Sequence, residues 1–99
     1  MKNLYEIEKL RKAKDTLRAI INPKRIEIIN LIHSKGEINV TDLYTKLRIV
    51  QAIASQHLAI LRKANIVLTE RKGKAILYSI NYEKINEINE GAKKIIGII

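Results

Sequence analysis

Hydrophobic residues recur at helical spacing at the start of this 99-residue chain. One apolar residue follows another after three or four positions, which is typical of an amphipathic helix that packs on one side. The pattern predicts a first helix over residues 4–21. Its apolar stripe consists of Leu10, Ala13, Leu17 and Ile20.

The segment INPKRIEIINLIHSKG carries the signals of a complete second helix. Asn22 can cap its start, Pro23 suits the first helical position, and Gly36 follows its end. Helical spacing then assigns an inward-facing side to this helix. We expect that side at Ile26, Ile29 and Ile32.

Two further helices are predicted close together. INVTDLYTKL, residues 38–47, has a candidate cap at Asn39 and an acid, Asp42, where the helix dipole favours negative charge. A fourth helix is predicted over residues 50–64, and Asn65 after it tolerates the left-handed backbone of a helix end. The third helix is expected to direct Leu43 and Leu47 to the core.

VLTERKGKAILYSI predicts a β-hairpin, because two β-prone runs flank Gly73, which supplies the positive φ of a tight turn.

A last helix is predicted over residues 82–99. The four isoleucines of its terminal IIGII would form an unusual apolar patch if exposed, which favours burial against a second subunit. The apolar face of this helix consists of Ile85, Ile88, Ala92, Ile95 and Ile99.

The predicted fourth helix has an unusual polar side. Residues 51–67 contain no acid, although 29% of the chain is charged. The first part of this side carries small and amide side chains, and its C-terminal end carries the bases Arg62 and Lys63. Small side chains permit close approach to the DNA major groove, and Gln can bond adenine through two hydrogen bonds. A short helix, a turn and such a helix predict a helix-turn-helix, with the basic hairpin as a wing on DNA.

Positive charge is concentrated in the same part of the chain. The formal net charge is +9, and residues 43–82 hold seven bases against one acid, Glu70. This distribution indicates a polyanionic partner, and nucleic acid is favoured over a membrane because the bases do not form one amphipathic helix. The seven bases are Lys46, Arg48, Arg62, Lys63, Arg71, Lys72 and Lys74.

Cysteine is absent, which excludes disulfides and thiolate metal sites and suits a reducing compartment. The N-terminal segment MKNLYEIEKLRKAKD lacks the apolar core of a signal peptide, and no run approaches the ~20 apolar residues of a membrane span. We therefore expect a cytoplasmic protein.

Three segments in order resemble the ArsR/SmtB family of winged helix-turn-helix transcriptional regulators: LRAIINPKRIEIINLI, LRIVQAIASQHLAILRKANIV and ERKGKAILYSI. The likeness runs over residues 17–80. It implies a mainly α (α+β) fold, a winged helix-turn-helix of order ααααββα, in one domain over residues 1–99. It also implies a homodimer that binds double-stranded DNA at an operator with two similar half-sites, most often as a repressor.

The resemblance further implies which segments do what. Residues 1–21 and 82–99 would be the dimerisation helices, residues 39–64 the helix-turn-helix and residues 66–80 the wing. DNA contacts are expected from Gln51, Ala52, Ser55, Gln56, Arg62, Lys63, Lys46, Arg48, Arg71, Lys72 and Lys74. Dimer contacts are expected from Leu10, Leu17, Ile88, Ala92, Ile95 and Ile99.

The chain departs from the family pattern at four places. Arg48-Ile49-Val50 stands where Gly-Leu-Ser is usual, and loss of the serine cap should cost about 1 kcal/mol. Ala52 replaces a usual Ser or Thr. The Cys-x-Cys metal site of many members falls on Asn39 and Thr41, and an alternative histidine site falls on Tyr82 and Lys84.

We therefore expect no metal and no cofactor, since zinc and soft metals require thiolate or imidazole ligands. His33 and His57, the two histidines, are interpreted as structural, His57 as a partly buried residue bonded to a backbone carbonyl. No phosphate-binding Gly loop, HExxH or nucleophile motif indicates an enzyme. A DNA-binding architectural protein without sensing and a winged-helix protein-interaction module remain alternatives, and any effector stays open.

Overall fold

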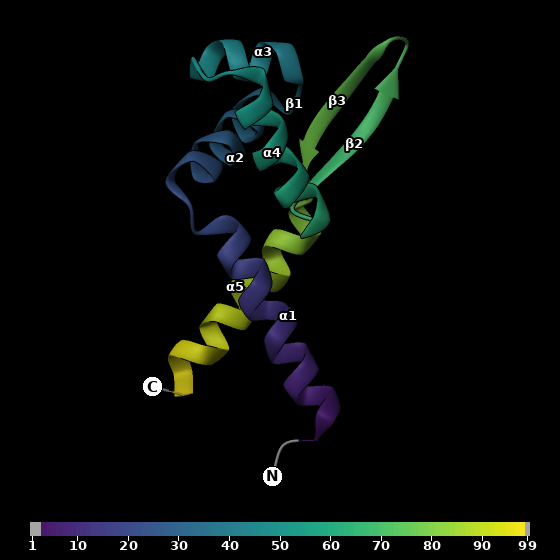
Figure 1. Ribbon diagram of the computed structural model, residues 1–99. Coiled ribbons are helices and arrows are strands. Elements are labelled where there is room, and N and C mark those ends of the chain that lie inside the picture. The colour runs from purple at the N-terminus through teal and green to yellow at the C-terminus, as the bar shows by residue number, and fades with distance from the viewer. Residues whose placement is uncertain (1–2, 99) are drawn as a thin grey trace.

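The computed structural model describes residues 3–98 and consists of helices with one small sheet (Figure 1). The elements are α1 (Leu4–Ile20), α2 (Pro23–Lys35), β1 (Glu37–Asn39), α3 (Val40–Leu47), α4 (Gln51–Lys63), β2 (Val67–Lys72), β3 (Ala75–Ile80) and α5 (Tyr82–Ile98). Helices α2, α3 and α4 form a body from which the β2–β3 hairpin projects, while α1 and α5 cross below it. The result is an elongated molecule of 50 × 26 × 22 Å.

The two asparagine caps that the sequence predicts are both present. The Asn22 side chain accepts hydrogen bonds from the Lys24 and Arg25 amides at 3.0 and 3.1 Å, and Pro23 occupies the first turn of α2. The Asn39 side chain accepts from the Asp42 amide at 2.8 Å and starts α3. Each cap satisfies an amide that the helix leaves without a partner.

The turn between α3 and α4 is held by an unusual backbone conformation. Arg48 lies in the left-handed region, with φ of 55°, and its amide donates to the carbonyls of Thr45 and Tyr44. Val50 then occupies the cap position of α4 and provides no side-chain hydrogen bond. The sequence indicated that α4 lacks a serine cap, and the helix indeed begins without a side-chain acceptor. Asn65, with φ of 62°, follows α4 in the left-handed conformation that was expected.

The sheet has three antiparallel strands in the order β1–β3–β2. The hairpin and its turn at Gly73, with φ of 63°, were predicted. β1 was not predicted, because its three residues take their conformation from pairing with β3, where Ile38 lies opposite Tyr78. This pairing attaches the inner half of the hairpin to the helical body.

The core lies where α2, α3, α4 and the sheet meet. Its fully buried large side chains are Ile28, Ile32, Leu43, Leu58, Leu61, Ile66 and Val67. One predicted core position is wrong: Ile26 is 43% exposed and Ile28 is buried instead. Because i and i+4 lie on one face of a helix, Ile28 and Ile32 define the buried stripe, and Ile26 falls outside it. Ile29 and Leu47 pack at the edge of this core.

α1 buries a narrower surface than its apolar stripe suggested. Thr16 and Ala19, near its C-terminal end, are buried, while Leu10 and Ala13 are exposed. The Thr16 hydroxyl donates to the Lys12 carbonyl at 2.8 Å, so its burial leaves no unmet hydrogen bond there. The N-terminal part of α1 therefore carries apolar side chains that this chain does not cover. None of the described helices is long and apolar enough to span a bilayer.

α3, the turn at Arg48, α4 and the hairpin together have the arrangement of a winged helix-turn-helix. The predicted order of helices and hairpin is confirmed, with β1 as the additional element.

Candidate nucleic-acid interface

α4 presents one face to the core and another to solvent. Ala54, Leu58 and Leu61 are buried on the inner face. The opposite face is exposed along the first two turns, at Gln51, Ala52, Ser55 and Gln56. The four residues expected to contact bases therefore lie together on one accessible surface, which we call the α4 face. It carries amide, hydroxyl and methyl groups and no charge.

The predicted basic residues lie on three parts of the winged helix-turn-helix. Lys46 and Arg48 lie at the end of α3, Arg62 and Lys63 in the last turn of α4, and Arg71, Lys72 and Lys74 at the tip of the hairpin. All seven are exposed. Exposed cations together with an uncharged, accessible helix face form a surface suited to contact with a phosphate backbone on both sides of a groove.

Two of the hairpin cations have partners within the chain. The Lys72 ammonium lies 3.2 Å from the Glu37 carboxylate, which comes from β1. The Arg71 guanidinium donates to the Gly73 carbonyl at 3.4 Å, within the turn. Both contacts are exposed to solvent, and sequence reasoning identified neither.

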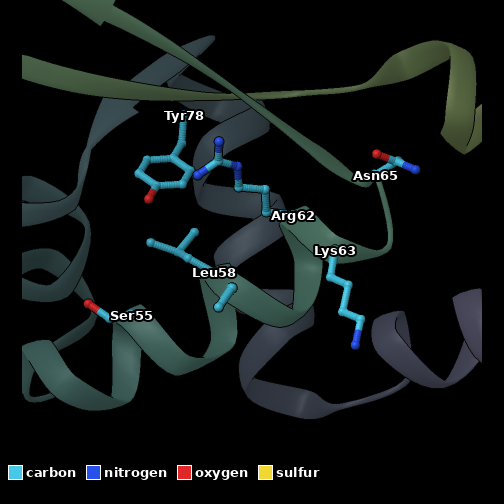
Figure 2. A pocket seen from close by; sticks show the side chains of 7 residues that line it. Ser55, Leu58, Arg62, Lys63, Asn65 and Tyr78 are labelled. Atoms are coloured by element: carbon cyan, nitrogen blue, oxygen red, sulfur yellow. The ribbon is translucent and has the colours of Figure 1, made fainter.

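An open groove runs along α4 beside the hairpin and extends from Ser55 to Asn65 (Figure 2). Its volume is about 530 Å³, and the residues that line it include Leu58, Ala59, Arg62 and Tyr78. Figure 2 shows Arg62 extending from α4 toward Tyr78 on β3, whereas Lys63 points away from Tyr78. Tyr78 packs partly against the core, and it also lines this groove.

His57 lies on the inner side of α4 and is partly buried. The expected partner, a backbone carbonyl, is wrong: the nearest polar group is the Arg25 guanidinium of α2, with Nη1 at 3.3 Å from His57 Nδ1. Burial, followed by the positive charges of Arg25 and Lys24, lowers the pKa of His57 below its usual value of 6.5. These effects favour the neutral form of the imidazole.

The second histidine joins α2 to α5. His33 Nδ1 lies 2.7 Å from the Tyr82 hydroxyl, and the two rings meet edge to face with centroids 5.7 Å apart. This contact agrees with the structural role expected of His33. Within the described side chains, no three carboxylates or imidazoles cluster at a separation suited to a metal ion.

Three of the six predicted dimer residues have side chains that the structure describes, and three do not. Leu10 is exposed, Leu17 is half-buried, and Ile88 packs partly against this chain's own core. The side chains of Ala92 and Ile95, and all of Ile99, lie outside the described residues. Sequence reasoning missed Leu4 and Tyr5, which are 81% and 74% exposed on the first turn of α1.

Comparison with known proteins agrees with this geometry. The model of the family described as "Bacterial regulatory protein, arsR family" matches residues 22–69, from the cap of α2 into β2. The arsenical resistance operon repressor of Bacillus subtilis is 35% identical over 79 residues, which are 80% of this chain and 75% of that protein. The transcriptional activator HlyU of Vibrio cholerae is 32% identical over 89% of this chain and 82% of its own length.

A solved structure extends the likeness to nearly the whole chain. The crystal structure of NolR from Sinorhizobium fredii superimposes with a TM-score of 0.74 at 32% identity and covers 96% of this chain and 94% of that one. Its coverage includes the hairpin and both crossing helices. Sequence and fold thus agree, and the chain belongs to the arsR family of bacterial regulatory proteins, a family of transcriptional regulators.

Proposed function

We propose that this protein is a homodimeric, sequence-specific DNA-binding repressor that covers an operator with two similar half-sites. The observation that carries the proposal is the α4 face: an exposed, acid-free helix surface on an element that ends in the exposed cations Arg62 and Lys63. A face exposed only for solubility would carry mixed Lys and Glu, as α1 does. The uncharged face is instead suited to base edges in the major groove.

Each part of the surface has a distinct task. Gln51 and Gln56 can each bond adenine through the amide, and Ser55 can bond several base edges. Ala52 keeps the helix close to the groove floor. Phosphate contacts from the basic residues fix the position of the helix on the duplex without selecting sequence.

The groove between α4 and the hairpin continues the same surface toward the DNA backbone. Arg62 extends along it toward Tyr78, and Asn65 closes its far end (Figure 2). A guanidinium can bind phosphate through two hydrogen bonds, and a tyrosine hydroxyl can donate a further one. We therefore assign this groove to a backbone phosphate beside the half-site, with Arg62 as the main contact.

Dimerisation follows from the apolar surface of α1. Leu4, Tyr5, Ile7 and Leu10 are large apolar side chains left exposed on its first two turns. A second copy of the chain is the partner that would cover them. The C-terminal part of α5 would belong to the same dimer interface. Two copies related by a two-fold axis would place two α4 faces on one side of a duplex, as a palindromic operator requires.

We further propose that the protein acts in the cytoplasm and is not an enzyme. It would not sense metals at the sites that other family members use. Asn39 and Thr41 replace the cysteines of the resembled metal site. Asn39 is already committed to capping α3. An effector of another kind is compatible with these residues.

The proposal is tested by selection of bound duplexes from a random library with the full-length protein. We expect enrichment of one motif in two inverted copies, spaced by about one helical turn or a multiple of it. Binding without any enriched motif would support an architectural DNA-binding protein instead. No retention of duplex even at low salt would leave the interaction-module alternative.

A further inference from the structure

Arg25 connects three helices through one side chain. It lies in the first turn of α2, and its guanidinium donates to the Ala19 carbonyl and, at 3.3 Å, to the Arg18 carbonyl, both in the last turn of α1. The same guanidinium reaches His57 Nδ1 on α4 at 3.3 Å. The Asn22 cap holds the Arg25 amide at 3.1 Å and so fixes the base of the side chain.

The chemistry of the contact fixes the state of His57. A guanidinium is always charged and offers only donors, so His57 Nδ1 must accept the hydrogen bond and its proton must be on Nε2. A protonated imidazole has no acceptor nitrogen and would face Arg25 as a second cation. The charged groups that act on His57 are Arg25 and Lys24, both cations of α2, while α1 contributes the two carbonyls that bind Arg25.

The contact lies behind the α4 face. His57 follows Gln56 directly on the same helix, on the side turned toward α2. Because α4 is one rigid element, a bond at His57 limits how far the α4 face can rotate relative to α1. α1 in turn carries the exposed apolar surface assigned above to the partner subunit. The Arg25–His57 contact thus links the surface proposed for dimerisation with the surface proposed for base recognition.

We infer that Arg25 is a positioning residue for DNA recognition, which holds α4 in register with α1 through the neutral His57 imidazole. The inference rests on the proposed function. It means that protonation of His57 breaks the contact, frees α4 to rotate and weakens operator binding. Sequence-specific affinity therefore decreases as the solution is acidified.

Operator affinity measured against pH tests this inference with three variants. His57→Gln keeps a neutral acceptor that cannot be protonated, Arg25→Ala removes the donor, and Lys35→Ala is a control that removes one exposed cation from the other end of α2. As the pH falls from about 7.5 below the lowered pKa of His57, we expect the wild type to lose more affinity than His57→Gln, by up to roughly five-fold, the size of one hydrogen bond. Lys35→Ala should follow the wild type.

Arg25→Ala should bind the operator several-fold more weakly than Lys35→Ala at about pH 7.5 and should show no additional His57-dependent loss on acidification. A second readout needs no DNA: the imidazole ¹⁵N shifts of His57 should report the Nε2–H tautomer in the wild type and lose that preference in Arg25→Ala. Circular dichroism at each pH verifies that every variant is folded.

Two results overturn the inference. Parallel loss of affinity in the wild type and His57→Gln would show that His57 does not position α4, while operator binding itself, and hence the proposed function, would stand. An unchanged His57 tautomer in Arg25→Ala would equally reject it. Failure of every protein, wild type included, to select an operator would instead reject the proposed function and the inference with it.

Discussion

The Lys72 ammonium, on the hairpin, lies 3.2 Å from the Glu37 carboxylate on β1. Both side chains are about half exposed, so the pair contributes no more than ~1 kcal/mol to stability. The position of this ion pair matters more for DNA binding than its contribution to stability. It places an acid beside a cation that we assign to DNA phosphates, and so reduces the charge that the hairpin offers to the duplex.

Glu37→Gln should therefore strengthen DNA binding. Removal of the carboxylate frees Lys72 and lowers the repulsion of phosphates, so we expect a gain of roughly two- to five-fold at low salt that shrinks as salt screens the charges. Fluorescence anisotropy with a labelled duplex measures it. Glu8→Gln is the matched control, because Glu8 also forms a surface ion pair, at 3.6 Å with Arg11, but on α1. A weaker complex with Glu37→Gln would mean that the pair positions the hairpin instead.

Lys74→Ala should weaken binding to all sequences alike. Lys74 lies at the tip of the hairpin, which we assign to backbone phosphates rather than base edges. Loss of one phosphate contact should reduce the slope of log affinity against log salt by about 0.9. Affinities for the operator and for a scrambled duplex, each measured over a salt series, test this. A change confined to the operator would assign Lys74 to base recognition.

Val50→Ser should stabilise the protein. Val50 caps α4 without a side-chain hydrogen bond, and serine there could accept one from the first turn, for a gain of about 1 kcal/mol in the free energy of unfolding. Urea denaturation followed by circular dichroism measures the change. Asn39→Ala is the opposite control, since it removes an existing cap from α3 and should cost about 1 kcal/mol. Destabilisation by Val50→Ser would show that the valine packing outweighs the missing cap.

Stability should also depend on His57 and pH. Because the folded-state pKa of His57 is lowered, by burial first and then by Arg25 and Lys24, the unfolded chain binds the proton more readily. The contribution of neutral His57 is complete above its usual pKa of 6.5 and is lost as the pH falls from there toward the lowered value. The free energy of unfolding of the wild type should thus decrease on acidification more than that of His57→Gln. Equal decreases in the two proteins would contradict a lowered pKa.

Much of the fold was predictable because its signals are local. The caps at Asn22 and Asn39, the turn at Gly73 and the left-handed Asn65 each depend on the preferences of a few adjacent residues. The α4 face was predictable for a related reason: which side of a helix lacks acids can be deduced from spacing alone. Its exposure in the folded protein agrees with the prediction, while the DNA contacts of its residues stay predictions.

The features that were missed depend on long-range contacts. β1 exists because Ile38 pairs opposite Tyr78, forty positions along the chain. The choice of Ile28 over Ile26 for the core depends on how α2 is rotated against its neighbours. The Arg25–His57 contact joins residues 32 positions apart, and neither residue type indicates the other in the sequence.

Base discrimination by Gln51 and Gln56 tests the central claim most directly. A Gln51→Ala, Gln56→Ala double variant is measured against the selected operator and against operators with single base-pair changes. We expect the preference at the contacted positions to fall by roughly 1–3 kcal/mol per contact, while affinity for scrambled duplex stays within a factor of about two. If the double variant instead retains the wild-type discrimination at every operator position, the α4 face does not recognise DNA sequence.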